Sequence, residues 1–394
     1  MLKDEAFMST DVKSLLCVDA VLDASDRMLQ EAQHGGTPFS VDEDALNALA
    51  RELAERIRTQ YGRQAVPLHA RWRHFETACP ETFMIFMERL QGTSDIGTAE
   101  ALIDLAVVSV LLDAGAGKAW RYHSPEAGII GRSEGLAVAS LEMFMQGIFA
   151  ATEDDPNRVD AHALINLKPE QLAEGLQHRS DNALAGFEGR CAMLNALGHT
   201  LNDHGLSRCA DILKPYRTLE EASDVLERFL CVLGFVFPSR LTLDGIPMGD
   251  VWHYGPWNEP VALHKLPQWL SYSCIEPLAY VNVHLERDDS LTALAEYRNG
   301  GLLMDAGVLK LREPYLIEEQ HHPGSDVIIA WRALTVGLIE CLADLVRDIL
   351  ETSSEDLPMG GILQAGTWAM GRERAARLRN GAPPLSIISD GTVF

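Results

Sequence analysis

Residues 326–351 read DVIIAWRALTVGLIECLADLVRDILE, and this stretch carries the strongest helical signal in the chain. One set of positions recurs every three or four residues, which is the spacing of one face of an α-helix. The stripe consists of Ile328, Trp331, Thr335, Leu338, Leu342, Val346 and Ile349, and the charged Glu340, Asp344 and Arg347 lie opposite. We therefore expect a long helix that packs this face into the core.

Helical periodicity extends over most of the remaining chain. It predicts helices at about 40–61, 10–32, 80–91, 98–113, 133–150, 169–177, 187–203, 218–234, 267–283, 290–298 and 367–379. Capping-box patterns mark two starts, Ser40 with Glu43 and Thr218 with Glu221. Strand signals are short, at 66–75, 302–311 and 385–394. Since strands and helices do not alternate and no glycine-rich phosphate motif is present, nucleotide-binding folds are excluded. The predicted fold is mainly α, with small β pieces, in a single compact multi-helix domain over residues 1–394.

The charge of the chain restricts its partners. The 394 residues carry a formal net charge of −24, and 47% of them are hydrophobic. Nucleic acids and anionic membranes are bound mainly through surplus Lys and Arg, so neither is expected as a partner. A small anionic ligand needs only two or three local cations and stays open. No secretory apolar segment begins the chain and no apolar run approaches the roughly 18 residues of a membrane helix. We expect a cytoplasmic protein.

Metal and disulfide chemistry are not indicated. The seven cysteines are odd in number and widely spaced, without a CxxC pair, which favours buried reduced thiols. His321 and His322 are neighbours whose side chains point apart in an extended chain. We predict no metal and no cofactor.

Residues 69–75 (HARWRHF) form a basic stretch in an acidic chain. If it is extended, His69, Arg71, Arg73 and Phe75 share one face, with Trp72 and His74 on the other. Paired guanidinium groups suit phosphate or carboxylate recognition. Internal salt bridges to the abundant Asp and Glu are the alternative. The Gly-x-Gly turn at 115–117 is a second possible anion site, although a plain helix end explains it as well.

Residues 249–273 combine aromatic, basic and acidic side chains. Pro267 fits the first turn of a helix, which places His264 and Lys265 at a helix N-terminus that favours anions. On that helix Trp269 shares a face with Glu276. Together with Asp250 and Trp252 before them, these residues suggest the wall of a pocket for a polar ring. An aromatic packing corner is the alternative.

Three further segments contribute candidates. Asp305 lies in an apolar run, where burial raises a carboxyl pKa unless the group is paired, and Arg298 is its nearest expected partner. Arg332 flanks the apolar stripe of 326–351 and should therefore be paired. The apolar C-terminal stretch 383–394 is expected to dock against the fold and to bring Asp390 near structured protein.

Several of these stretches resemble the uracil-catabolism protein family of fungi and bacteria. The matching segments are 69–75 (HARWRHF), 131–136 (GRSEGL), 187–190 (FEGR), 264–273 (HKLPQWLSYS), 297–301 (YRNGG), 331–335 (WRALT), 366–369 (GTWA) and 387–394 (IISDGTVF). They follow one another along nearly the whole chain. The run 265–268 is also similar, more weakly, to one in queuosine-salvage nucleotide glycohydrolases, whose fold is related to helical DNA glycosylases. That family's aspartate before the run is Leu263 here, so its catalytic carboxylate does not carry over.

The resemblance implies pyrimidine degradation, with cleavage of the N-glycosidic bond of a ring-opened uracil nucleoside or nucleotide and release of urea. We assign Asp305 or Asp250 as the catalytic carboxylate and His264 as proton donor to the leaving nitrogen. The predicted substrate-binding residues are Arg71, Arg73, His74, Trp252, Lys265, Trp269, Glu276, Arg298, Arg332 and Asp390. The expected ligand is a small molecule, either free or as a ribose phosphate derivative, with contact to other uracil-pathway enzymes open. Amide or ureide hydrolysis of a ring-opened pyrimidine and a non-catalytic partner of the ring-opening enzyme are the alternatives.

Overall fold

The computed structural model describes residues 9–62, 64–234, 236–237, 241–285 and 290–388. Helices dominate these ranges, which confirms the mainly α class. They are α1 (Thr10–Leu15), α2 (Val18–Gln33), α3 (Glu43–Tyr61), α4 (Trp72–Ala78), α5 (Pro80–Leu90), α6 (Asp95–Leu112), α7 (Arg132–Met145), α8 (Ala161–Asn166), α9 (Pro169–Gly175), α10 (Phe187–Asp203), α11 (Ala222–Leu233), α12 (Lys265–Ala279), α13 (Tyr297–Asp305), α14 (Asp326–Leu350), α15 (Met359–Ile362) and α16 (Trp368–Arg379). Short 3₁₀ helices are η1 (Cys209–Leu213), η2 (Tyr216–Thr218) and η3 (Pro314–Ile317), and η4 (Leu363–Thr367) is a π-helix.

The described strands form only two-stranded sheets. Antiparallel pairs join β1 (Phe39–Val41) to β8 (Leu309–Leu311), β2 (Tyr122–Ser124) to β3 (Gly128–Ile130), β4 (Thr242–Leu243) to β5 (Ile246–Pro247), and β6 (Val251–Tyr254) to β7 (Glu259–Ala262). A parallel pair joins β9 (Gln320–His321) to β10 (Ser386–Ile387). These strand pairs connect loops near the helices, and they do not join into a larger sheet.

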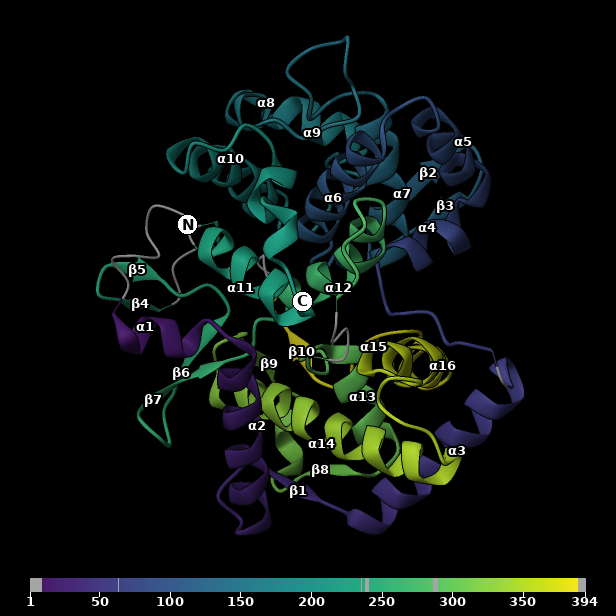
Figure 1. Cartoon of the computed structure of the whole chain (residues 1–394). Coiled ribbons are helices and arrows are strands. Elements are labelled where there is room, and N and C mark those ends of the chain that lie inside the picture. Colours follow the sequence, from purple (N-terminus) through teal and green to yellow (C-terminus); the bar gives the residue numbers. More distant parts are fainter. Residues whose placement is uncertain (1–8, 63, 235, 238–240, 286–289, 389–394) are drawn as a thin grey trace.

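The helices gather in two groups (Figure 1). In that view the upper group contains α4 to α11, and the lower group contains α1 to α3 and α13 to α16. In the upper group α6 is surrounded by α7, α10 and α12, so nearly every side chain from Thr98 to Leu112 is buried. In the lower group α14 packs against α2, α3 and α13. α12 lies between the two groups.

The prediction that 326–351 forms a core helix is confirmed. α14 runs over Asp326–Leu350 and buries Ile328, Trp331 and Leu338 almost completely. The stripe reaches the surface only in the last turn, where Ile349 is 38% exposed. Among the described residues no helix has the length and apolar character needed to cross a membrane.

The prediction of an extended segment at 66–75 is wrong from residue 72 onward. α4 begins at Trp72 because tertiary contacts outweigh the local pattern: Trp72 Nε1 donates to the carbonyl of Ser273 (2.7 Å), and the helix packs against α7. The alternating face of His69, Arg71, Arg73 and Phe75 therefore does not form. His74 instead turns toward the same cavity as His69.

Several predicted boundaries also differ. Residues 302–305 end helix α13, and only Leu309–Leu311 of the predicted strand 302–311 forms one. The helix expected at 290–298 begins only at Tyr297, because Glu296 caps it through the N–H groups of Arg298 and Asn299. Of the strand expected at 385–394, Ser386–Ile387 pairs as β10, and 389–394 lie outside the described residues.

The two predicted capping boxes are displaced. Asp42, and not Ser40, caps α3 by accepting from the N–H of Ala45 at 3.0 Å. α11 starts after Glu221, which pairs with Asp224 in a capping box, so Thr218 lies outside the helix. In both cases a carboxylate nearer the first helical turn takes the role.

A buried ion pair joins the lower helix group to the start of α12. Arg332 on α14 donates to both carboxylate oxygens of Asp250, at 2.8 and 2.7 Å, and its Nε donates to the carbonyl of Ala295. Asp250 also accepts from Trp252 Nε1 (2.7 Å) and from the N–H of Lys265 (2.9 Å). Burial alone would raise the pKa of Asp250, but the Arg332 charge and these hydrogen bonds lower it to about 2. The pair therefore fixes the first residue of α12.

Replacement of Asp250 by asparagine should lower the free energy of unfolding by about 3 kcal/mol, because it removes the negative charge opposite the buried Arg332 guanidinium. Urea denaturation followed by circular dichroism measures the loss. Asp344→Asn is the control. Asp344 lies on α14, the helix that carries Arg332, and its side chain is 78% exposed and pairs with Arg347 at the surface. That change should cost less than about 0.5 kcal/mol. Equal losses in the two variants would contradict the structural role of Asp250.

Candidate functional site

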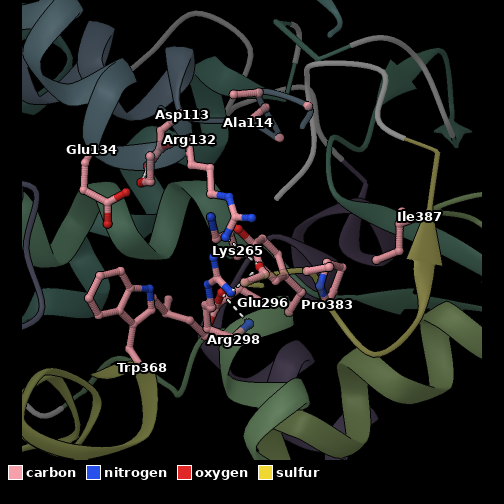
Figure 2. Close-up of a pocket in the computed structure, with 18 of the residues that line it drawn as sticks. Asp113, Ala114, Arg132, Glu134, Lys265, Glu296, Arg298, Trp368, Pro383 and Ile387 are labelled. Carbon is pink, nitrogen blue, oxygen red and sulfur yellow. Dashed lines mark hydrogen bonds between the residues drawn. The ribbon is translucent and has the colours of Figure 1, made fainter. Parts of the chain in front are cut away.

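A cavity of about 260 Å³ lies between the two helix groups, beside the start of α12. Figure 2 shows Asp113, Arg132 and Glu134 on one side of it and Arg298 and Trp368 on the other. The lining residues are His69, His74, 113–118, 132–134, Lys265, Trp269, Leu294, 296–298, Pro323, Trp368, 381–383, Ser386 and Ile387. Segments far apart in sequence thus converge on one space, which is typical of a ligand site.

Four aromatic rings form one wall, which we call the aromatic box: His69, His74, Trp269 and Trp368. The His69 ring stacks on Trp269 with centroids 5.9 Å apart and lies 5.3 Å from Trp368. The His74 ring meets the same two indoles edge-on, at 5.5 and 5.3 Å. Such a wall offers flat apolar faces to a planar group.

Both imidazoles of the box are neutral. Burial lowers the pKa of His69 to about 4, and burial together with the Arg71 charge lowers the pKa of His74 well below its ordinary value. His69 Nδ1 lies 2.9 Å from Gln364 Oε1, an acceptor, so Nδ1 carries the proton and Nε2 keeps a lone pair. The Ser133 hydroxyl donates to Asp113, so His74 Nε2, 3.4 Å away, is the donor toward Ser133 Oγ. His74 Nδ1 is left as an acceptor.

Two fully buried polar atoms of the box have no hydrogen-bond partner within the described ranges. They are His74 Nδ1, an acceptor, and Trp269 Nε1, a donor. Buried polar groups are almost always paired, so orphaned atoms beside a cavity indicate positions for a ligand or water. The box therefore offers lone pairs from two imidazoles and one indole N–H.

Three carboxylates line the cavity. Asp113 Oδ2 accepts from Arg71 Nη1 (2.8 Å) and from Ser133 Oγ, whereas no hydrogen bond to Oδ1 is recorded in the part of the chain that the structure describes. Glu134 forms a 2.6 Å ion pair with Arg372. Glu296 uses both oxygens to cap α13, and burial raises its pKa. The three groups thus differ in charge environment within one cavity.

Besides the exposed Lys118, three cations line the cavity, and we call them the cation triad: Arg132, Lys265 and Arg298. Arg132 Nη1 and Arg298 Nη1 both donate to the carbonyl of Gly381, at 2.7 and 2.9 Å. The Lys265 ammonium lies 5.1 Å from the Trp269 ring centroid, and burial lowers its pKa. None of the three forms a carboxylate ion pair with a described residue.

Four of the residues predicted from sequence line this cavity: His74, Lys265, Trp269 and Arg298. The prediction that His264 and Lys265 mark a helix N-terminus is confirmed, since α12 begins at Lys265 after His264, whose φ is 44°. The ligand-binding roles of the four residues stay predictions.

The predicted carboxylates and their neighbours lie elsewhere. Asp250, Trp252 and Arg332 form the buried cluster behind α12. Asp305 is engaged on both oxygens by Arg379, at 2.7 Å each, and not by Arg298 as expected. His264 is fully buried, and its Nε2 lies 2.7 Å from the carbonyl of Leu15. These side chains are outside the cavity lining, so the geometry does not support their catalytic assignment.

The other residues predicted to bind substrate do not line the cavity or lie outside the described residues. Arg71 is buried behind Asp113, and Arg73 pairs with Glu276 at 3.0 Å away from the cavity, which agrees with the alternative of internal salt bridges. Asp390 lies outside the described residues. Within those residues no group of three His, Cys, Asp or Glu side chains is placed to hold a metal ion.

Sequence reasoning missed much of the lining: Asp113, Arg132, Ser133, Glu134, Glu296 and Trp368. Two signals pointed to some of them. The segments 131–136 and 366–369 belong to the family resemblance, and Asp113 lies two residues before the Gly-x-Gly turn. Arg132 adopts a left-handed φ of 57°, a strained conformation that no sequence pattern reveals.

Comparison with known proteins gives matches over nearly the whole chain. Residues 14–394 match the family model described as "Protein of unknown function (DUF1688)". "Protein urg3" of Schizosaccharomyces pombe is 35% identical over 400 residues, covering 98% of this chain and 100% of that protein. "Uracil catabolism protein 4" of Lachancea kluyveri is 32% identical over 412 residues, covering 92% and 93%. The resemblance to the uracil-catabolism protein family is thereby confirmed.

The buried His69 should leave a signature in the pH dependence of stability. Its pKa of about 4 lies below the ordinary 6.5, so unfolding takes up a proton between these pH values. The free energy of unfolding therefore falls as the pH drops from about 6.5 toward 4, with a His69 share of about 3 kcal/mol. His69→Phe keeps a ring in the box and should show a shallower slope in urea denaturation over this range. His123→Phe, at an exposed histidine, is the control. Parallel curves for wild type and His69→Phe would contradict the assignment.

Proposed function

The chain belongs to the DUF1688 family, and on that premise we propose that it acts in uracil catabolism by hydrolysing an N-glycosidic bond. The substrate class is a ring-opened uracil nucleoside or nucleotide of the ribosylurea type, and the leaving group is urea. The names of "Protein urg3" and "Uracil catabolism protein 4" support the pathway. The chemistry of the cavity supports the reaction.

The aromatic box is the observation that carries this proposal. A ureido group is planar, with several N–H donors and one carbonyl acceptor. His69 Nε2 and His74 Nδ1 offer lone pairs for the N–H groups, and the unpaired Trp269 Nε1 offers a donor for the carbonyl. Because both imidazoles are neutral, they accept these hydrogen bonds at neutral pH. The flat ring faces suit the planar group.

The carboxylates beside the box supply groups for hydrolysis. Breaking the bond between the sugar carbon and nitrogen builds positive charge on the sugar, which a nearby carboxylate stabilises. We assign this role to Asp113, which Arg71 and Ser133 hold in place through Oδ2 while Oδ1 stays available. Water adds to the sugar carbon and passes a proton to Asp113. Glu296, whose pKa burial raises, donates its own proton to the leaving nitrogen, and solvent then carries the proton from Asp113 back to Glu296.

Asp113 and Glu296 take the places first given to Asp250, Asp305 and His264. Both oxygens of Asp250 and of Asp305 are committed to ion pairs with arginine, so neither carboxylate faces a reacting atom. Lys265, Trp269, His74 and Arg298 keep the substrate-binding roles that the sequence suggested. Asp250 acts indirectly, because it holds the N–H of Lys265.

Asp113→Asn should reduce urea release by about 100-fold or more, because the uncharged amide neither stabilises the sugar cation nor activates water. The assay incubates purified protein with ribosylurea and with its 5′-phosphate and measures urea. Asp211→Asn is the matched control, since Asp211 pairs with Lys214 on η1 outside the cavity. Circular dichroism verifies that both variants fold. A folded Asp113→Asn protein with full activity would refute the assignment, and no urea from wild type with either substrate would refute the function.

One contact favours a second candidate, amide or ureide hydrolysis of a ring-opened pyrimidine. Ser133 Oγ lies 3.4 Å from His74 Nε2, which is reminiscent of a serine nucleophile and its base. However, the Ser133 hydroxyl donates to Asp113 and not to His74, so its proton is not directed at the base.

The products and a serine variant separate the two candidates. Glycosidic cleavage leaves intact urea, whereas amide or ureide hydrolysis by a seryl nucleophile releases ammonia from the ring-opened base. Ser133→Ala should retain urea release within about tenfold, because Ser133 only orients Asp113 and His74 in the first reaction. Loss of ammonia release by more than about 1,000-fold in this variant would instead establish Ser133 as a nucleophile.

A further inference from the structure

The cation triad is an anomaly in a chain of net charge −24. Lys265 is 8% exposed and Arg298 is 7% exposed, so both charges are largely removed from water. Burying a charge is costly unless a counter-charge or hydrogen bonds compensate it. In the described part of the chain the only side-chain hydrogen bonds of Arg132 and Arg298 go to backbone carbonyls, and the Lys265 ammonium makes none.

The anions of the cavity do not neutralise this triad. Asp113 is paired with Arg71 and Glu134 with Arg372, so both are compensated from behind the cavity wall. Glu296 is the remaining carboxylate of the lining, and its two oxygens accept from backbone N–H groups of α13. Even when Glu296 is ionised, one carboxylate remains for the three cations of the triad, and the exposed Lys118 adds a fourth, so the cavity keeps an excess of positive charge.

We infer that the cation triad binds the dianionic phosphate of a phosphomonoester, so the substrate is the 5′-phosphate of the ring-opened nucleoside and not the free nucleoside. This inference rests on the proposed function for the sugar and the leaving group, but the phosphate site itself rests on the triad alone. A dianion matches the charge excess. Guanidinium groups and an ammonium converging from α7, α12 and α13 provide donors from three directions, as a tetrahedral anion requires.

The backbone near Gly381 holds the two guanidinium groups together. Arg132 donates to the carbonyls of Asn380 (2.8 Å) and Gly381, which follow the last turn of α16. A Cβ on Gly381 would lie 1.8 Å from Arg132 Nη1, and the residue has a φ of +82°, so only glycine allows this approach. Arg298 keeps its Nη2 for a ligand, because that atom makes no hydrogen bond to a described residue, whereas Arg132 Nη2 donates to the carbonyl of Asn380.

The triad adjoins the aromatic box through Lys265. Lys265 belongs to both sites, because its ammonium lies 5.1 Å from the Trp269 ring. Figure 2 shows Lys265 between the side chains of Arg132 and Arg298, with Trp368 of the box to one side. A ureido group in the box and a phosphate at the triad would therefore place the ribose between them, next to the carboxylates of the lining.

The test compares two substrates and one selective variant. Wild type should hydrolyse ribosylurea 5′-phosphate with a kcat/KM about 100-fold above that of ribosylurea, because the phosphate forms several charge-assisted hydrogen bonds. Arg298→Met should lower kcat/KM for the phosphate ester by about 10- to 100-fold more than it lowers kcat/KM for the unphosphorylated substrate. A folding defect would lower both values together. Arg121→Met is the control, since Arg121 also donates to backbone carbonyls but is outside the cavity lining.

A titration without turnover separates this inference from the proposed function. Ribose 5-phosphate binding is measured by calorimetry to wild type, Arg298→Met and Arg121→Met. Weaker binding to Arg298→Met alone supports the phosphate site, even if neither ribosylurea compound yields urea. Equal binding to all three proteins, or equal kcat/KM for the two substrates in wild type, overturns it, and the proposed glycosidic hydrolysis can then still hold for the free nucleoside.

Discussion

The buried ion pair between Asp250 and Arg332 is the interaction on which the cavity depends. It connects α14, the central helix of the lower group, to the first residue of α12, which carries Lys265 into the cavity. Trp269 follows one helical turn later on the same face. A buried bidentate ion pair fixes both the direction and the distance between its two side chains. It therefore holds the start of α12, and with it Lys265 and Trp269, in one position. Both oxygens of the Asp250 carboxylate are occupied by these contacts, and the side chain does not line the cavity.

The local sequence pattern predicted those helices whose position depends mainly on residues within one segment. The stripe of 326–351 specified α14 because its helical spacing is contained within one segment, although the helix then packs against α2, α3 and α13. Pro267 located the start of α12. The segment 66–75 was mistaken because Pro67 favours an extended chain, whereas the indole of Trp72 finds its acceptor on Ser273, some 200 residues away in sequence. A contact of that kind is visible only after the two helices have packed.

The residues of the candidate site also fall into those that local sequence predicted and those that it did not. His74, Lys265, Trp269 and Arg298 stood out as charged or aromatic anomalies within their own segments, and the structure brings them to one cavity. The lining carboxylates did not stand out, because an acidic chain offers many and their environment is set by distant residues. The carboxylate of Asp113 is held in place by an ion pair with Arg71, which sequence alone had placed on a phosphate-binding face. The convergence of several segments, and not any single motif, makes the site.

The net charge of the chain and the charge of the cation triad have opposite effects on an anionic ligand. A chain of net charge −24 repels a phosphate dianion at long range, yet this repulsion is screened within about 8 Å at physiological ionic strength. Inside the cavity the triad is shielded from such screening by burial, so its attraction persists at high salt. Salt should therefore speed the approach of an anionic substrate more than it weakens the bound complex. An acidic surface and a cationic pocket are compatible because they act over different distances, and the acidic surface also disfavours larger polyanions that the small cavity does not admit.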